Sequence, residues 1–310
     1  MKRIEQNKAR AGWGWLLGCW LIMALLGGCS DELDGGFKGE ANKAVVRLDR
    51  LTPMPARVYD QQANAVKMAV AAMLSPGGTV MSYRPLQSYL EQKLGRPVQL
   101  IQRRTYQEVN EMLARNLVDF AFVCTGAFVA GQEQGIMELL VIPRIEGRET
   151  YQALLIAAAD SAIRSLDDMR GKVFAFTDPL SNTGYLYPMS RLRKRGESVE
   201  SFFGRIIFTY SHDNSIAAVA DGVVDAASVD SIVFAHTLRR EPELAGKIRV
   251  IERSREFGMP PVAVSSQADP AARQRYKEIL LAIHEDPAGA DVLAALGVER
   301  FVEPNPDLYR

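Results

Sequence analysis

Short apolar runs alternate with helical segments along most of this chain, and this alternation is the feature that most restricts its fold. The runs have the length and composition of strands, and helix signals lie between them. Because a strand that returns to its sheet through a helix pairs in parallel, the order predicts α/β lobes with largely parallel sheets. The predicted strands are 66–74, 98–101, 119–123, 137–142, 154–158, 173–176, 206–208, 226–229 and 248–251.

Local signals also mark helix ends. After a Pro-Gly-Gly turn, apolar residues recur at helical spacing from Leu86 to Leu94, and Gly95 ends the pattern. Thr105 begins another helix, with Glu108 three residues later at the spacing of a capping box.

The alternation divides into two blocks. Extended runs around 151–158 and 259–265 flank the second block, so we expect the chain to cross between two lobes there. The expected parts are a first lobe over 65–155, a second lobe over 156–260, and a return strand with C-terminal helices over 261–310 that packs on the first lobe.

The N-terminus has the pattern of an export signal. A basic start precedes an apolar run over 13–26, which ends in Leu-Gly-Gly followed by Cys29. This junction resembles the bacterial lipobox, so we expect a signal peptide over 1–28, a lipid on Cys29, and a flexible tether over 29–64 rich in charge, Gly and Pro. The alternative is an uncleaved anchor, although the apolar run is short against the ~20 residues of a spanning helix. Either alternative puts the rest of the chain outside the cytoplasm, on the periplasmic side of a bacterial membrane.

Cysteine usage and charge limit the partners. With Cys19 removed and Cys29 acylated, Cys124 is the remaining thiol, so one mature chain can form no internal disulfide. Without residues 1–28 the chain has 33 Lys and Arg against 36 Asp and Glu, a net charge of about −3. A broad cationic field for nucleic acid is therefore not expected, and recognition of an anion has to be local.

One segment has the composition of an anion-binding turn. It runs from Asp178 to Pro188, between a predicted strand and a predicted helix, and contains Ser181, Asn182 and Thr183 in succession. A helix start presents unpaired backbone N–H groups and a partial positive charge, to which these side chains add donors. The alternative is a plain helix cap, for which the same residue types are suited.

A histidine follows the next predicted strand. His212 precedes a short helix, so it lies at the carboxyl end of a strand, where α/β sheets bind ligands. An imidazole can donate to an anionic oxygen, but a lone histidine is more often structural.

Together the two segments resemble the phosphate/phosphite/phosphonate substrate-binding proteins of ABC transporters, which have the periplasmic binding protein type II fold. The likeness covers about 65–305. The family's pattern of Asp-Pro, Ser/Thr-Gly and a later Pro is matched by Asp178, Pro179, Thr183, Gly184 and Pro188. Its following His, Gly and Val-Asp are matched by His212, Gly222, Val224 and Asp225.

The resemblance implies two α/β lobes joined by a two-strand hinge, with the ligand bound between them. It implies anion contacts from Ser181, Asn182, Thr183 and His212 in the second lobe, and from Tyr106 and Tyr151 in the first lobe and at the hinge. Asn182 departs from the hydroxyl residue expected there, although its amide can donate. Thr125, at the end of a predicted strand, is a further candidate on position alone.

Specificity is expected to depend on acids near the site. Where an aminoalkylphosphonate binder has carboxylates for the ammonium group, this sequence has Ile232 and Met259-Pro260, which argues against 2-aminoethylphosphonate. Asp230 is a nearby acid that can accept from a ligand's own P–OH proton. The alternative is that Asp230 only caps the helix that follows it.

An enzyme is not expected. Cys124 and His212 have no evident third group, and the three histidines lack the spacing of a metal site. We therefore expect a monomeric binding protein without cofactor or metal, which closes its lobes on the oxyanion and delivers it to an ABC transporter permease. The alternative is an accessory protein that presents the same anion to a membrane sensor.

Overall fold

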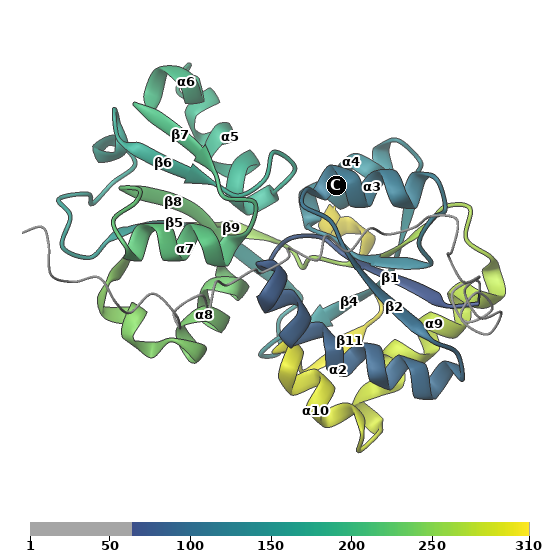
Figure 1. The fold of residues 1–310 in the computed structure, drawn as a ribbon. Helices are drawn as coiled ribbons and strands as arrows, with labels where there is room; N and C mark the ends of the chain where they lie inside the picture. Colours follow the sequence, from purple (N-terminus) through teal and green to yellow (C-terminus); the bar gives the residue numbers. More distant parts are fainter. Residues whose placement is uncertain (1–63, 310) are drawn as a thin grey trace, which may run out of the picture. The chain divides into compact units, whose positions relative to one another are not determined.

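The computed structural model describes residues 64–309, which form two α/β lobes, each built on one β-sheet. Figure 1 shows the chain passing from the first sheet to the second and back again. The predicted signal peptide, Cys29 and the tether lie outside the described residues. Among residues 64–309, no helix is long and apolar enough to cross a membrane.

The first sheet has six strands in the order β11-β4-β10-β3-β1-β2. β1 pairs in parallel with β2 and β3, whereas β10 pairs antiparallel with β3 and β4, and β11 pairs antiparallel with β4. The bounds are β1 (Val66–Val70), β2 (Val98–Gln102), β3 (Phe120–Phe122), β4 (Met137–Arg144), β10 (Val262–Ser265) and β11 (Arg300–Val302).

Helices cover both faces of the first sheet. One core combines the sheet with apolar residues of α2, α9 and α10, and the other combines it with those of α3 and α4. The capping box that the sequence predicts is present, since Thr105 and Glu108 exchange hydrogen bonds at the start of α3. The bounds are α2 (Pro76–Leu94), α3 (Tyr106–Ala114), α4 (Thr125–Glu133), α9 (Pro270–Ala282) and α10 (Gly289–Leu296).

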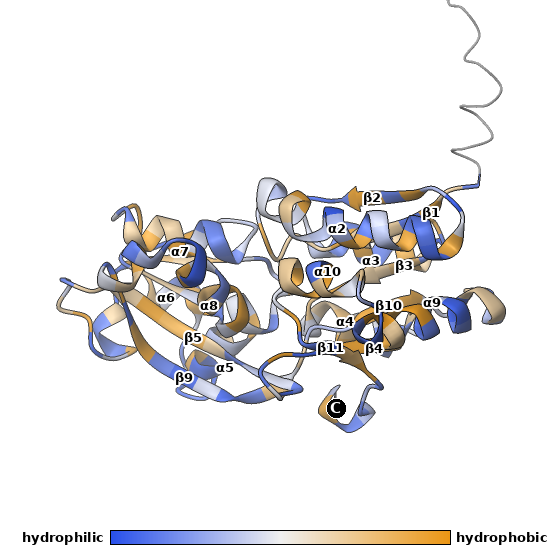
Figure 2. Cartoon of the chain, turned by 90° about the horizontal axis from the view of Figure 1, so that it is seen from below, coloured by the Kyte–Doolittle hydropathy of each residue, from blue (hydrophilic) through white to orange (hydrophobic). Residues whose placement is uncertain are grey.

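The second sheet has five strands in the order β7-β6-β8-β5-β9. β6 pairs in parallel with β7 and β8, and β5 pairs antiparallel with β8 and β9. Figure 2 shows the hydrophobic colouring of β5, which lies between β8 and β9 and whose middle residues are fully buried. The bounds are β5 (Thr150–Ala158), β6 (Val173–Phe176), β7 (Arg205–Phe208), β8 (Ala226–Asp230) and β9 (Ile248–Gly258).

Four α-helices, a π-helical turn and the 3-10 helices η2 (Asp167–Met169) and η4 (Pro242–Gly246) complete the described second lobe. α7 and α8 contribute to the core on one face of the sheet, and α5 and α6 to the core on the other. The bounds are α5 (Tyr187–Arg193), α6 (Val199–Phe202), α7 (His212–Ala220), α8 (Ser231–Arg240) and the π-helical turn η3 (Asn182–Leu186).

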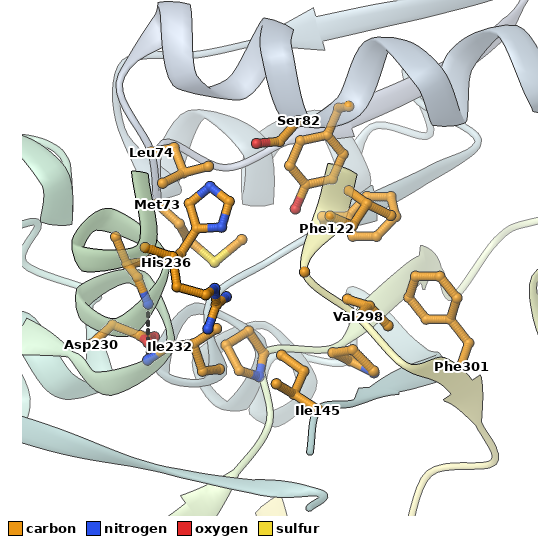
Figure 3. A pocket seen from close by; sticks show the side chains of 17 residues that line it. Met73, Leu74, Ser82, Phe122, Ile145, Asp230, Ile232, His236, Val298 and Phe301 are labelled. Atoms are coloured by element: carbon orange, nitrogen blue, oxygen red, sulfur yellow. Dashed lines mark hydrogen bonds between the residues drawn. The ribbon is translucent and has the colours of Figure 1, made fainter. Parts of the chain in front are cut away.

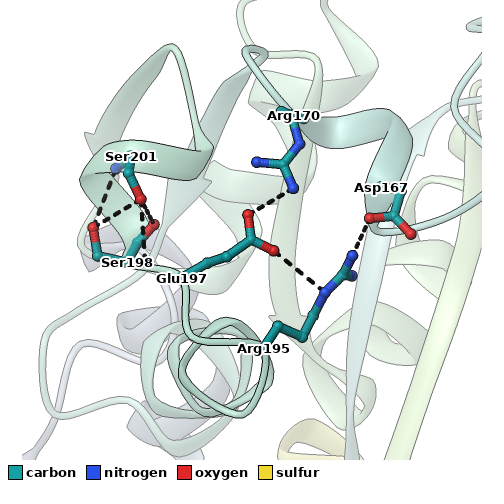
Figure 4. Close-up of polar contacts among 6 residues, drawn as sticks. All are labelled: Asp167, Arg170, Arg195, Glu197, Ser198 and Ser201. Atoms are coloured by element: carbon teal, nitrogen blue, oxygen red, sulfur yellow. Dashed lines mark hydrogen bonds and ion pairs between the residues drawn. The ribbon is translucent and has the colours of Figure 1, made fainter.

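Polar contacts at the surface hold the loops around α6. Figure 4 shows Glu197 between Arg170, at 2.6 Å, and Arg195, at 3.4 Å, with Asp167 on the other side of Arg195. Ser198 and Ser201 form the capping box of α6 beside them. Because these charges are largely exposed, each pair contributes at most about 1 kcal/mol to stability.

The structure corrects the predicted sheets at the strands near the crossings. The prediction of largely parallel pairing is wrong for β4, β5, β9 and β10, because strands that pass directly from lobe to lobe enter their sheets without a crossover helix. It is also wrong for β11, which returns to the edge of the first sheet and pairs antiparallel with β4. The predicted lobe boundary after residue 155 falls inside β5, which pairs within the second sheet over its whole length, so the first crossing is at 145–149. The C-terminal segment, expected to be helical, also contains β11.

Candidate functional site

The site residues predicted from the sequence lie mainly at helix starts. All of them except Tyr151 are caps or early residues of helices that follow the carboxyl ends of strands β2, β3, β6, β7 and β8. We call this group the interlobe cluster: Tyr106, Thr125, Tyr151, Ser181, Asn182, Thr183, His212 and Asp230. Since each helix start carries a partial positive charge, their arrangement favours an anion.

The turn after β6 presents hydroxyl and amide groups from the second lobe. The Ser181 hydroxyl accepts a hydrogen bond from the Gly184 N–H at 2.9 Å and so caps η3. Gly184 is required there, because a Cβ would come within 2.4 Å of the Thr177 hydroxyl. The Thr183 side chain is fully buried, yet its hydroxyl has no hydrogen-bond partner among residues 64–309. This turn therefore holds a buried donor with its bonding capacity unused.

His212 is a buried, neutral donor. Its Nδ1 receives the backbone N–H of Asp230 at 3.1 Å, and the Thr177 hydroxyl is also 3.1 Å from Nδ1. A backbone N–H can only donate, so the ring proton lies on Nε2, which is 3.4 Å from the Ser181 hydroxyl. Burial lowers the pKa of His212 to about 3. The ring consequently donates from Nε2 without carrying a charge.

Asp230 caps α8 and has a raised pKa. Its carboxylate caps α8 by accepting from the N–H groups of Ile232, at 2.6 Å, and Val233, at 3.2 Å. The side chain is buried, and burial raises the pKa of Asp230 to about 7 in spite of these bonds. The helix cap that the sequence left as an alternative is thus present, and the same carboxyl group is partly protonated near neutral pH. Its contact with a ligand stays a prediction.

Two tyrosines belong to the cluster: Tyr106 at the start of α3 in the first lobe, and Tyr151 on β5 of the second sheet, next to the first crossing and not in the first lobe as the predicted boundary had it. Burial raises the pKa of Tyr106 and of Tyr151 well above the ordinary value, so both keep their hydroxyl protons. Within the described part of the chain the Tyr106 hydroxyl has no hydrogen-bond partner, and the Tyr151 hydroxyl is 3.4 Å from the side-chain nitrogen of Asn182. Both tyrosines lie within electrostatic range of Asp230, which locates them at the same site.

The hydroxyl of Thr125, at the start of α4, forms a hydrogen bond within the protein. The Thr125 hydroxyl donates to the Gly258 carbonyl oxygen at 2.8 Å, which ties α4 to the end of β9. Its role as a ligand contact stays a prediction. Cys124, in the same Cys-Thr-Gly-Ala segment, is a buried free thiol that the sequence analysis did not include among the candidate ligand contacts. Burial raises the pKa of the Cys124 thiol to about 11, against the lowering effect of the nearby Asn182 and Gly126 N–H groups.

Hydrogen bonds join the lobes around the cluster. The backbone N–H of Tyr106 donates to the Asp178 carboxylate at 3.1 Å, and that of His212 donates to the Met73 carbonyl oxygen at 3.0 Å. Gly126 allows α4 of the first lobe to approach the turn after β6 closely, because a Cβ at this position would lie 2.4 Å from the Leu180 carbonyl oxygen. Asp178, which the sequence matched only as part of a motif, therefore links the two lobes.

The cluster can bind an anion but offers no arrangement for covalent chemistry. Its donors are hydroxyl, imidazole and amide groups together with helix N-termini, and none of its members is Lys or Arg. The raised pKa of the Cys124 thiol makes it a poor nucleophile. Among residues 64–309, no group of three or more His, Cys, Asp and Glu side chains could hold a metal ion. A donor-lined site between two lobes defines a binding protein for a small anion.

The comparison with protein families identifies the kind of binding protein. The profile of the family described as "ABC transporter, phosphonate, periplasmic substrate-binding protein" matches residues 68–309. The chain belongs to this family, whose members are binding proteins and not enzymes, and which function in the periplasm.

Individual relatives agree with this assignment. The phosphate-import protein PhnD of Mycolicibacterium smegmatis is 33% identical over 184 residues, which are 56% of this chain and 57% of that protein. A binding protein component of an ABC phosphonate transporter from Pseudomonas aeruginosa has a TM-score of 0.74 at 22% identity, over 79% of this chain and 83% of its own. PhnD1 of Prochlorococcus marinus, in complex with methylphosphonate, has a TM-score of 0.72 at 16% identity, over 80% of this chain and 95% of its own. These structures show the periplasmic binding protein type II fold.

Proposed function

We propose that this chain captures a small tetrahedral oxyanion of the phosphate, phosphite or phosphonate kind and delivers it to an ABC importer. The observation that supports this most directly is the pair of buried hydroxyl groups without partners, on Thr183 and Tyr106, which belong to different lobes. A buried unpaired hydroxyl costs about 1–3 kcal/mol, so a ligand that accepts from both recovers that cost.

The number of donors is sufficient for tight binding. Thr183, His212, Asn182 and the two tyrosines can each contribute one hydrogen bond to a charged oxygen. At about 1.5–3 kcal/mol per bond, four or five bonds support micromolar affinity or better after the cost of ordering the ligand. Closure of the lobes around the anion is then the change that the transporter recognises.

Calorimetric titration of the full-length protein tests the ligand class. Phosphate, phosphite, methylphosphonate, 2-aminoethylphosphonate and sulfate are compared at one ionic strength. We expect at least one of the first three to bind with micromolar or lower Kd and sulfate to bind at least tenfold more weakly. Absence of binding by all three phosphorus oxyanions would contradict the proposal.

Delivery to an importer is tested by the partner. We expect the protein, cross-linked in membranes in the presence of its ligand, to be recovered with an ABC permease. Recovery of a membrane sensor in place of a permease would instead support the alternative of ligand sensing. We also propose that the protein acts as a monomer, which sedimentation with and without ligand checks.

We further propose that Cys29 attaches the protein to the membrane through a lipid. The support is the basic start, the apolar run and the Leu-Gly-Gly-Cys junction in the sequence. Cys29→Ala should yield an exported protein that no longer incorporates a labelled fatty acid, with Cys124→Ala as the matched control that keeps the label. Label that persists on the Cys29 variant would refute the lipid attachment.

A further inference from the structure

Helix α2 of the first lobe begins with an incomplete cap of its own. Its N-cap is Ser75, whose hydroxyl accepts from the Gly78 N–H at 3.4 Å. In a capping box the third helical residue is Glu or Gln, and its side chain accepts from the N-cap N–H in return. The third residue of α2 is Gly78, and the first turn contains no acidic residue. The Ser75 N–H therefore finds no side-chain acceptor in that turn.

The second lobe provides the missing acceptor. The carboxylate of Asp213, in the first turn of α7, accepts from the Ser75 N–H, with its two oxygens at 2.9 and 3.0 Å from the nitrogen. Asp213 also lies where a side chain on the third helical residue would begin, because a Cβ on Gly78 would be 3.3 Å from its Oδ2. A carboxylate at a helix start is favoured by the helix dipole as well. Asp213 thus completes the cap of α2 from the other lobe.

Helix α3 shows the same cap completed within the first lobe. Glu108 accepts from the Thr105 N–H at 2.8 Å, and the Thr105 hydroxyl accepts from the Glu108 N–H. The second lobe reaches α3 too, but there Asp178 accepts from the following N–H, that of Tyr106. Of these two helices, α2 is the one whose capping box depends on the position of the second lobe.

Neighbouring contacts hold the same two segments together. The His212 N–H donates to the Met73 carbonyl oxygen at 3.0 Å, and Leu74 packs against the apolar core of the second lobe. Figure 3 shows Met73 and Leu74 near His236 of α8, where these residues line a cavity of about 100 Å³ along that helix. All these contacts join protein atoms, so they favour closed lobes with or without a ligand. Because Asp213 follows His212 directly, the position of α7 that completes the cap also fixes the position of His212.

We propose that Asp213 is a positioning residue that holds the lobes in the closed form, in which they are joined as in this structure, by completing the cap of α2. It keeps a large share of the unliganded protein closed and so raises the affinity for the anion without contacting the anion. The inference rests on the proposed capture of an oxyanion for its effect on affinity only, since the effect on closure needs no ligand.

Three variants test the cap. Asp213→Ala removes the acceptor, whereas Asp213→Asn is the conservative variant, because its side-chain oxygen can still accept from the Ser75 N–H. Gly78→Glu provides the acceptor within α2, as Glu108 does in α3, and places a second carboxylate beside Asp213 when the lobes close. The cap of α2 then no longer requires closure, and repulsion between the two carboxylates opposes it.

Fluorescence energy transfer in single molecules measures closure without a ligand. Leu117→Cys in the first lobe and Val223→Cys in the second carry the dyes, since both positions are exposed whereas Cys124 is buried. Loss of a cap acceptor shifts an equilibrium roughly 5- to 30-fold, which corresponds to about 1–2 kcal/mol. The closed-to-open ratio should fall by this factor in Asp213→Ala and in Gly78→Glu, and should stay close to that of the wild type in Asp213→Asn.

Calorimetry with phosphate, phosphite and methylphosphonate measures the effect on affinity. The Kd of whichever anion binds should rise in Asp213→Ala and Gly78→Glu by at most the same factor, because the closed form that binds is less populated. Denaturant unfolding separates closure from folding. Gly78→Glu should be at least as stable as the wild type, since Glu is favoured over Gly in a helix. A cap that served stability alone would leave both the closed share and the Kd of Gly78→Glu unchanged.

Asp269→Ala is the matched control. Asp269 caps α9 within the first lobe by accepting from the Ala272 N–H at 2.8 Å. Its loss also removes a carboxylate cap, so it should lower stability while leaving the closed-to-open ratio and the Kd unchanged. Opening of the lobes in this control would refute the inference, because any weakened cap in the first lobe would then have the same effect.

The outcomes separate the two proposals. If Asp213→Ala and Gly78→Glu are closed to the same extent as the wild type, the inference is refuted, while binding of a phosphorus oxyanion would leave the proposed function standing. If no phosphorus oxyanion binds, the proposed function is refuted, and the fluorescence measurement, which needs no ligand, decides the inference alone.

Discussion

Thr183→Val should have opposite effects on stability and on ligand binding. Valine has nearly the shape of threonine but no hydroxyl, and the Thr183 hydroxyl is buried without a partner. Removing a buried polar group that makes no hydrogen bond recovers its desolvation cost, so the unliganded variant should be more stable by about 1 kcal/mol. For a folded part of this size, that corresponds to a rise in Tm of about 2–4 °C.

The same change should weaken binding. In the complex the hydroxyl donates to a charged oxygen, a bond that contributes about 1.5–3 kcal/mol. The Kd for the tightest-binding phosphorus oxyanion should therefore rise about 10- to 150-fold. Calorimetry measures the Kd, and denaturant unfolding without ligand measures the free energy of unfolding.

Thr209→Val is the matched control in the same lobe. The Thr209 hydroxyl is 2.6 Å from that of Ser215 and 2.9 Å from the Ser211 carbonyl oxygen, so its bonding capacity is used within the protein. Its loss should lower stability by about 1–2 kcal/mol and leave the Kd unchanged. If Thr183→Val behaves like this control, with lower stability and an unchanged Kd, the assignment of Thr183 as a ligand donor is wrong.

Three other predictions concern buried titratable groups. His212→Ala should weaken binding of the tightest-binding phosphorus oxyanion by about 1.5–3 kcal/mol relative to the wild type measured at the same pH. The loss should be equal at pH 5.5 and pH 8, because a ring whose pKa is held near 3 stays neutral throughout; a loss confined to low pH would indicate a charged imidazole instead. Asp230 has a folded pKa of about 7, above its unfolded value of about 3.9, so the stability that it contributes is present at low pH and is lost as the pH rises through 4 to 7. The free energy of unfolding of Asp230→Asn, measured with denaturant, should accordingly rise relative to that of the wild type as the pH increases from 4.5 to 7.5. The variant's sulfate-to-phosphite affinity ratio should also rise. If the difference in unfolding free energy does not change with pH and the affinity ratio is that of the wild type, Asp230 is only a helix cap. Alkylation of Cys124 at pH 8, followed by mass spectrometry of its peptide, should be slow in the native protein, slower still with ligand and fast in urea. Rapid labelling in all three conditions would contradict the burial of Cys124 beside the site.

Much of the fold was predictable because its signals are local. The apolar runs at β1, β3, β6 and β8 and the capping box at Thr105 depend on residues close together in the sequence. The positions of His212 and Thr183 after strands followed from the same alternation, since a ligand site at the carboxyl end of a strand needs only the order of elements.

The antiparallel strands could not be predicted in this way. Whether β5 pairs in parallel depends on which strands lie beside it, and its partners β8 and β9 are far away in the sequence. β11 has three residues and is defined only by its pairing with β4. Such short strands carry little periodicity, so tertiary contacts determine them.

By itself, the sequence determined the α/β class, the helix starts and the residue types available to an anion, because strand and cap preferences are properties of neighbouring residues. Only the tertiary structure decided that the Asp230 N–H fixes the proton of His212 on Nε2, that burial raises the pKa of Asp230 to about 7, and that the Thr183 and Tyr106 hydroxyls remain unpaired. The cavity along α8 likewise depends on wall residues from both lobes. Burial, pKa and cavity volume all depend on atoms brought together from distant parts of the chain, and no local pattern in the sequence encodes them.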